Sequence, residues 1–321
     1  MGRQSQSGPR LIERACLLLA RAQRLRDQGR PGAALPVGLR SLALFLKHDR
    51  PGSLDTVNAH LEVGGALLDL GRYADAGVEV RNAHAILRKR RGGGDIARLR
   101  HHASIEAGHV AILQGRDANA RAWFARALRV AELHGLPWLS RARALNGLGM
   151  AAKYTGRFDE SERLYRLSMD NVRHAGAAGG PMSAVILHNL GGLEYARGRL
   201  AQAERFAILG LRRRRRCSGP RSVAMATDLA GLAAIVQARG RRVEAGKLYR
   251  KALSVLRRRL GSNHFEVNFN LAQLASLSAS EGRFAASRRL FGQAIPRLTR
   301  ALGAGHKVVK HFAAACEAIG S

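Results

Sequence analysis

The dipeptide Gly-Arg recurs along this chain at nearly constant intervals. The seven glycines are Gly29, Gly71, Gly115, Gly156, Gly198, Gly240 and Gly282. Successive glycines are 42, 44, 41, 42, 42 and 42 residues apart. A period of this length is typical of proteins built from stacked structural repeats, in which each repeat contacts only its neighbours. The spacing therefore predicts seven repeats.

The residues around each glycine keep the same register. Small residues stand seven positions before the glycine (Ala22, Gly64, Gly108, Gly149, Gly191, Ala233, Ala275) and five after it (Ala34, Ala76, Ala120, Ser161, Ala203, Ala245, Ser287). Bulky residues stand nine positions after it in four repeats (Phe124, Tyr165, Tyr249, Phe291). Short side chains let two helices approach closely, and bulky ones fill the gaps between them. Each repeat is thus predicted to be a helix, a Gly-Arg turn at positive φ, and a second helix.

These residues resemble the tetratricopeptide repeat, and more narrowly the 42-residue version seen in kinesin light chains and many bacterial repeat proteins. The resemblance is best over residues 144–319, where residues 190–195 and 198–204 read like the family's helix-turn-helix line. Residues 260–264 and 302–306 resemble its Leu-Gly-x-x-His linker, although Phe265 and Lys307 replace the proline that usually follows. The resemblance implies a fold made only of helices.

The predicted fold is all-α: a right-handed α-solenoid of about seven tetratricopeptide-like helix pairs plus a C-terminal capping helix at about residues 305–319. Residues 1–10 are polar and are predicted to be a disordered tail, and residues 11–321 to be a single solenoid. The first repeat departs most, since Pro36 inside its second helix removes a backbone hydrogen bond and is expected to kink that helix.

Composition excludes several classes of protein. Cys16, Cys217 and Cys316 are widely separated, so neither a disulfide framework nor a zinc site follows. No secretory signal and no run of apolar residues long enough to span a membrane is present, which favours a cytoplasmic protein. No metal, cofactor or catalytic motif is visible: Gly240 to Leu248 has the wrong spacing for a phosphate loop. A non-enzymatic protein is therefore expected.

A helix-pair solenoid presents its first helices on the concave wall, and the repeat register selects the side chains expected there. The candidates for binding a peptide are Arg143, Asn146, Lys153, Tyr154, His188, Asn189, Tyr195, Thr227 and Gln237. Amide side chains can hydrogen-bond a peptide backbone, and basic side chains can bind a carboxylate. The family resemblance implies the same use, because tetratricopeptide grooves commonly bind short peptides. The alternative is that these polar residues only solvate the wall.

Positive charge is the second unusual feature, with 54 basic against 23 acidic residues and a formal net charge of +31. Such a field attracts anions, although an arginine excess also arises from a GC-rich coding sequence. The candidates for binding a polyanion share one zone of the second helices: Arg88, Arg90, Arg91, Arg212, Arg213, Arg214, Arg215, Arg216, Arg257, Arg258 and Arg259. Five consecutive arginines repel one another, so a counter-anion is expected at that edge.

The sequence therefore predicts a scaffold or adaptor that binds a partner protein through an acidic peptide segment in a concave, basic groove. The alternative is a nucleic-acid-associated or regulatory repeat protein that uses the arginine-rich edge. That alternative lacks interleaved aromatic residues and any recognisable base-reading module. The oligomeric state is not predicted.

Overall fold

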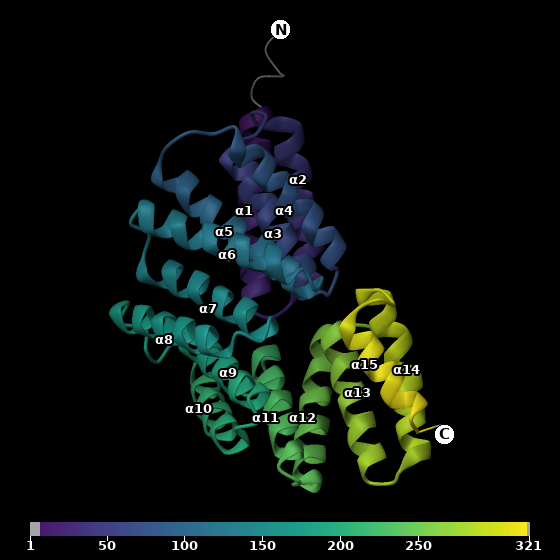
Figure 1. Cartoon of the computed structure of the whole chain (residues 1–321). Helices are drawn as coiled ribbons and strands as arrows, with labels where there is room; N and C mark the ends of the chain where they lie inside the picture. Colours follow the sequence, from purple (N-terminus) through teal and green to yellow (C-terminus); the bar gives the residue numbers. More distant parts are fainter. Residues whose placement is uncertain (1–6, 320–321) are drawn as a thin grey trace. The chain divides into compact units, whose positions relative to one another are not determined.

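The computed structural model describes residues 7–319, and within that range the chain forms fifteen α-helices and no strand (Figure 1). The helices are α1 (Ser7–Asp27), α2 (Pro31–His48), α3 (Leu54–Asp69), α4 (Tyr73–Arg88), α5 (Gly94–Leu113), α6 (Asp117–Leu133), α7 (Trp138–Tyr154), α8 (Phe158–His174), α9 (Pro181–Ala196), α10 (Leu200–Ser218), α11 (Val223–Ala238), α12 (Arg242–Leu260), α13 (Phe265–Ser280), α14 (Phe284–Leu302) and α15 (Lys307–Glu317). Seven helix pairs and a final single helix confirm the predicted fold class.

The Gly-Arg dipeptide forms the turn within each pair, as predicted. All seven glycines have positive φ, between 68° and 81°. In each turn the amide of the arginine donates to the carbonyl five residues earlier, for example Arg72 to Leu67 and Arg199 to Glu194 at 2.8 and 2.9 Å. This is the Schellman arrangement, which satisfies a helix-terminal carbonyl and needs a residue without Cβ at the turn.

The small and bulky positions of the register meet inside each pair. A Cβ on Gly108 would lie 2.5 Å from the ring of Phe124, and a Cβ on Gly149 would lie 2.6 Å from the ring of Tyr165. Both rings are fully buried. Where the bulky position holds Ala207, a Cβ on Gly191 would instead meet the backbone of the second helix. In the pairs of Phe124 and Tyr165 the seam between the two helices therefore depends on glycine opposite a ring.

Serine replaces alanine in two repeats and makes the same hydrogen bond in both. Ser161 donates to the carbonyl of Gly149, and Ser287 donates to that of Ala275, each at 2.8 Å. Both hydroxyls are buried. Each joins the second helix to the first at the point of closest approach, so the polar substitution leaves no buried donor unsatisfied.

First helices of successive pairs also contact one another: α1 with α3, α3 with α5, α9 with α11, and α11 with α13. Second helices of successive pairs make no contact of comparable extent among the described residues. Within each unit, the contacts between helices of the same kind in successive pairs are therefore made mainly by the first helices. The exposed and half-exposed side chains of the first helices are called the first-helix face below.

The chain divides into two compact units, unit 1 (Met1–Ala144) and unit 2 (Leu145–Ser321), with the boundary inside α7. Unit 2 ends with α15, where Phe312 is buried and its ring centroid lies 5.6 Å from that of Phe269 and 6.2 Å from that of Phe291. α15 thus covers the apolar end of the last pair, as predicted for a capping helix. The single continuous solenoid of the sequence analysis remains a prediction.

Two features of the first pair differ from expectation. α1 begins at Ser7, so residues 7–10 are helical and not part of a tail, while residues 1–6 lie outside the described residues. Pro9 is tolerated because the first turn of a helix has no intrahelical partner for its amides. α2 continues through Pro36 without interruption. Pro36 and Gly32 are both exposed, so the carbonyl that loses its hydrogen bond can be solvated.

Candidate functional site

The predicted peptide-binding residues all lie on the first helices α7, α9 and α11. Arg143 is exposed and belongs to unit 1, whereas the other eight belong to unit 2. Tyr154 and Tyr195 are 44% and 42% exposed. The side chains of Lys153, His188, Thr227 and Gln237 are partly exposed. These six residues of unit 2 remain accessible on the first-helix face.

Asn146 and Asn189 are placed differently from the rest of the predicted set. Both are buried, and the amide of Asn189 donates to the side-chain oxygen of Asn146 at 2.8 Å. The amide of Asn146 in turn lies 3.7 Å from the sulfur of Met150. The pair joins α7 to α9, so part of its hydrogen-bonding capacity is used within the protein.

Lys153, Tyr154 and Lys307 form a cluster between the two ends of unit 2. The Nζ atoms of Lys153 and Lys307 lie 4.8 and 4.9 Å from the centroid of the Tyr154 ring. Lys307 is the first residue of α15, and Tyr154 is the last residue of α7. The cluster therefore joins the start of α15 to the end of α7. A cation over an aromatic face is attracted by the ring quadrupole, so both ammonium groups interact favourably with the Tyr154 ring.

His188 is fixed by a chain of buried charges. Its Nδ1 lies 3.0 Å from Oδ1 of Asp228, and Nε of Arg214 donates to Oδ2 of Asp228 at 2.9 Å. Asp228 and Arg214 are both buried, whereas the His188 side chain is 35% exposed. A Cβ on Gly231 would lie 3.2 Å from the imidazole, so the ring rests on glycine. The imidazole is held in one orientation at the surface.

The arginine clusters predicted as a polyanion site are not uniformly exposed. Arg214 is buried in its ion pair with Asp228, and Arg213 donates to the carbonyl of Ala178 and to the hydroxyl of Ser183. Arg90 donates to the carbonyl of Gly52. The exposed members are Arg88, Arg90, Arg91, Arg212, Arg215, Arg216, Arg257, Arg258 and Arg259. The expected repulsion among five consecutive arginines is thus relieved partly by contacts within the protein.

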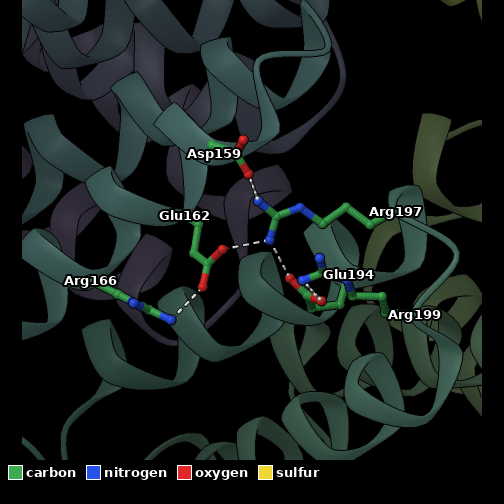
Figure 2. A network of polar contacts seen from close by, with 6 residues as sticks. All are labelled: Asp159, Glu162, Arg166, Glu194, Arg197 and Arg199. Atoms are coloured by element: carbon green, nitrogen blue, oxygen red, sulfur yellow. Dashed lines mark hydrogen bonds and ion pairs between the residues drawn. The ribbon is translucent and has the colours of Figure 1, made fainter.

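A second polar network joins successive repeats near their turns. Figure 2 shows Arg197 between Asp159, Glu162 and Glu194, at 2.5, 2.6 and 2.8 Å. The Arg197 side chain is only 7% exposed, and its hydrogen bond lowers the pKa of Glu162 below its ordinary value. The next repeat uses the same register, since Glu204 pairs with Arg239. These contacts join successive helix pairs.

Family models for the tetratricopeptide repeat match residues 95–174, 182–258 and 271–306, which together make up more than half of the chain. The chain belongs to the tetratricopeptide repeat family. Its 42-residue period and positive-φ turns are those of the predicted subtype. No curated protein matches the sequence.

Solved structures share the fold at low sequence identity. A Rap protein complexed with competence and sporulation factor has a TM-score of 0.66 and 12% identity, covering 96% of this chain and 88% of that one. NprR in complex with its cognate peptide NprX has a TM-score of 0.59 and 12% identity, covering 76% and 69%. BtubC (BKLC) from P. vanneervenii has a TM-score of 0.50 and 19% identity, covering 77% and 90%.

Sequence analysis missed Lys307 as a site residue and treated it only as a departure from the linker motif. No group of three or more histidine, cysteine or acidic side chains in residues 7–319 is arranged to hold a metal ion. Over the same range no helix is long and apolar enough to cross a membrane. The accessible residues of the first-helix face in unit 2, such as Tyr154, Lys153 and Gln237, offer aromatic contact, positive charge and hydrogen bonding.

Proposed function

We propose that this protein is a non-enzymatic adaptor that binds an acidic segment of a partner protein along the first-helix face of unit 2. The observation that carries the proposal is the convergence of Lys153 and Lys307 on Tyr154. Two ammonium groups at one exposed aromatic ring favour an anionic group, and a tyrosine ring adds apolar contact area for a peptide.

The fold supports the same proposal. A Rap protein of similar fold was solved in complex with competence and sporulation factor, and NprR with its cognate peptide NprX. This chain presents at least partly exposed Tyr195, Thr227 and Gln237 on its own first helices. Hydroxyl and amide groups at these positions can pair with the backbone of an extended segment. In this proposal the partner is held on the adaptor while another protein acts on it.

Nucleic acid is the alternative occupant of the positive surface. Arg214 is buried and Arg213 donates to Ser183, so the run of five arginines at residues 212–216 leaves Arg212, Arg215 and Arg216 exposed. This smaller exposed cluster weakens that alternative. A surface that neutralises phosphates also shows a steep dependence of affinity on salt, which a mixed polar and aromatic face does not share to the same degree.

The test is affinity purification of the tagged full chain from its native host at moderate salt, with and without nuclease, followed by mass spectrometry. Wild type is compared with Tyr195→Ala/Gln237→Ala on the first-helix face. The control is Leu167→Ala/Leu209→Ala, two exposed leucines of the second helices α8 and α10. Proteins that survive nuclease, bind wild type and the control, and are lost from the first variant support the proposal.

Either of two results contradicts it. If nuclease removes everything that binds, the exposed arginines of the polyanion candidates bind nucleic acid and are the functional surface. If partners persist equally with Tyr195→Ala/Gln237→Ala and are lost with the control, the partner binds the second helices.

A further inference from the structure

The junction between the third and fourth helix pairs, where α6 ends and α7 begins, exposes three large apolar side chains. Leu133, Trp138 and Leu139 are 71%, 44% and 37% exposed. At the other junctions between successive pairs in residues 7–319, Leu46 near the end of α2 is the only large apolar side chain within one helical turn that is comparably exposed. Apolar groups gathered at one place on a surface mark a contact with a partner or a membrane.

The backbone of this junction is anchored in unit 1. Gly135 has a positive φ of 58°, and the amide of Leu136 donates to the carbonyl of Ala131 at 2.9 Å. Leu136 is buried and belongs to one apolar cluster with Ala131 and with Ala97 of α5. The turn therefore has a defined conformation and holds its exposed side chains outward from a fixed base.

Three junctions of unit 1 lie along one edge. Arg90, in the junction after α4, donates to the carbonyl of Gly52, in the junction after α2. The third junction lies next to the second, since Ala97 in the first turns of α5 shares an apolar cluster with Leu136. The exposed residues at these three junctions and in the helical turns beside them are called the junction edge below.

Positive charge accompanies the exposed apolar groups on the junction edge. The central guanidinium carbon of Arg141 lies 4.8 Å from the centroid of the Trp138 ring, so a cation and an aromatic group meet at one place. The exposed cations of the edge that pair with no described carboxylate are Lys47, Arg50, Arg88, Lys89, Arg90, Arg91 and Arg129. The acidic residues of the edge are fewer: Asp49, Asp55, Asp95 and Glu132. Asp95 is already paired with Arg98.

This combination of side chains fits the interface of an anionic lipid bilayer. Tryptophan favours the headgroup region, leucine favours the acyl chains below it, and lysine and arginine are attracted to anionic headgroups. Single-stranded nucleic acid would also attract the cations and could stack on Trp138. It offers no apolar phase for the aliphatic side chains of Leu133 and Leu139. The observations therefore favour a membrane surface over a nucleic acid.

We infer that the junction edge of unit 1 binds the surface of an anionic lipid membrane. Leu133, Trp138 and Leu139 enter the interface, and the surrounding cations contact the headgroups. Binding of this kind needs no membrane-spanning helix. The inference uses residues of unit 1 only, whereas the proposed function uses unit 2, so it goes beyond that function and does not rest on it.

The first test is co-sedimentation of the full-length chain with vesicles. Vesicles of equal parts phosphatidylcholine and phosphatidylserine are expected to bind wild type more than about tenfold better than phosphatidylcholine alone. Leu133→Ala/Trp138→Ala is expected to weaken binding about tenfold, because two inserted apolar groups are lost. The matched control is Leu17→Ala/Leu39→Ala, at leucines of the same unit that are 66% and 46% exposed, and it is expected to bind as wild type does.

A charge variant separates local from overall attraction. Arg88→Gln/Arg91→Gln removes two cations of the edge and is expected to weaken binding to the anionic vesicles about tenfold. Lys247→Gln/Arg250→Gln removes the same charge from exposed positions on α12 and is expected to leave binding nearly unchanged. Equal losses in the two variants would mean that only the net charge matters, which contradicts the inference.

Tryptophan fluorescence reports insertion directly, and it does so without depending on a truncated side chain. The chain has two tryptophans, so Trp123→Phe leaves only Trp138 and Trp138→Phe leaves only Trp123. Trp123 is half-buried and stacks on His84, with ring centroids 4.6 Å apart. Anionic vesicles with brominated acyl chains quench an indole that enters the bilayer. They are expected to quench most of the Trp138 fluorescence and little of that from Trp123.

Three results overturn the inference. Wild type does not sediment with anionic vesicles, or it sediments while Trp138 is not quenched, or a single-stranded oligonucleotide quenches Trp138 while the vesicles do not. The last result assigns the junction edge to nucleic acid. None of the three bears on peptide binding by unit 2, which is tested separately through Tyr195 and Gln237.

Discussion

Phe124 lies so close to Gly108 that a single added methyl group would come within 2.5 Å of its ring. Gly108→Ala is therefore expected to destabilise the protein by about 1–3 kcal/mol through overpacking, measured by chemical denaturation. The control is Gly292→Ala in α14, where nothing lies within 4 Å of the added carbon and φ is not positive. That change is expected to be neutral or stabilising by up to about 1 kcal/mol. Equal losses in the two variants would contradict the packing account.

Arg197 satisfies three carboxylates from two helices while its side chain stays 7% exposed. Arg197→Ala leaves Glu194, which is 1% exposed, with only Arg199 at 3.6 Å. We expect a loss of about 3 kcal/mol in the free energy of unfolding, because a buried charge loses its principal partner. Arg166→Ala removes an exposed arginine from the same network and is expected to cost less than about 1 kcal/mol. A small loss in both variants would show that the network contributes little.

His101 makes stability depend on pH. It is buried, and since a carbonyl can only accept, its Nε2 donates to the carbonyl of Ser140 at 3.1 Å. Burial, together with smaller contributions from neighbouring His102 and Arg143, lowers the pKa of His101 from 6.5 to about 4. The folded chain thus resists a proton that the unfolded chain accepts. Above pH 6.5 His101 is neutral in both states and does not lower the free energy of unfolding. As the pH falls from 6.5 toward 4, the unfolded chain binds the proton first, so the free energy of unfolding decreases.

The matched variant is His101→Gln, whose amide can still donate to Ser140 and does not titrate. The difference in unfolding free energy between wild type and variant is expected to change by up to about 3 kcal/mol between pH 7 and pH 4, with wild type losing more. Other titrating groups are common to both proteins. Parallel stability curves over this range would contradict the assignment.

Much of the fold followed from the sequence because the repeat is encoded locally. A turn at positive φ needs glycine, and the seven Gly-Arg dipeptides marked every such turn within a helix pair. The ends of the second helices were harder to predict from the sequence. Gly135, Gly176 and Gly219 also have positive φ there, but no common dipeptide marks them, so only residues 260–264 and 302–306 revealed that junction.

The site was predicted less completely, because the register gives the position of a side chain but not its partners. Asn146 and Asn189 stand at positions expected to be open, yet each finds the other across the α7 and α9 contact. A periodic signal for Arg214 was present: Ala207, Gly210 and Leu211 precede it by seven, four and three residues and are all buried. That spacing places Arg214 on the packed side of α10.

Lys307 illustrates the limit of reasoning from one repeat. Its contact with Tyr154 joins helices that lie far apart in the sequence, and such a contact depends on how the helices of unit 2 pack together.

The most direct test of the central claim is site-specific photo-crosslinking in living cells. A photoreactive amino acid replaces Tyr195 on the first-helix face of unit 2 or, as the matched control, Leu209 on α10; the two are 42% and 46% exposed. The account predicts a discrete crosslinked partner protein from position 195 and none from position 209. Crosslinking from position 209 alone, or to nucleic acid alone, would contradict the claim that the first-helix face binds a partner protein.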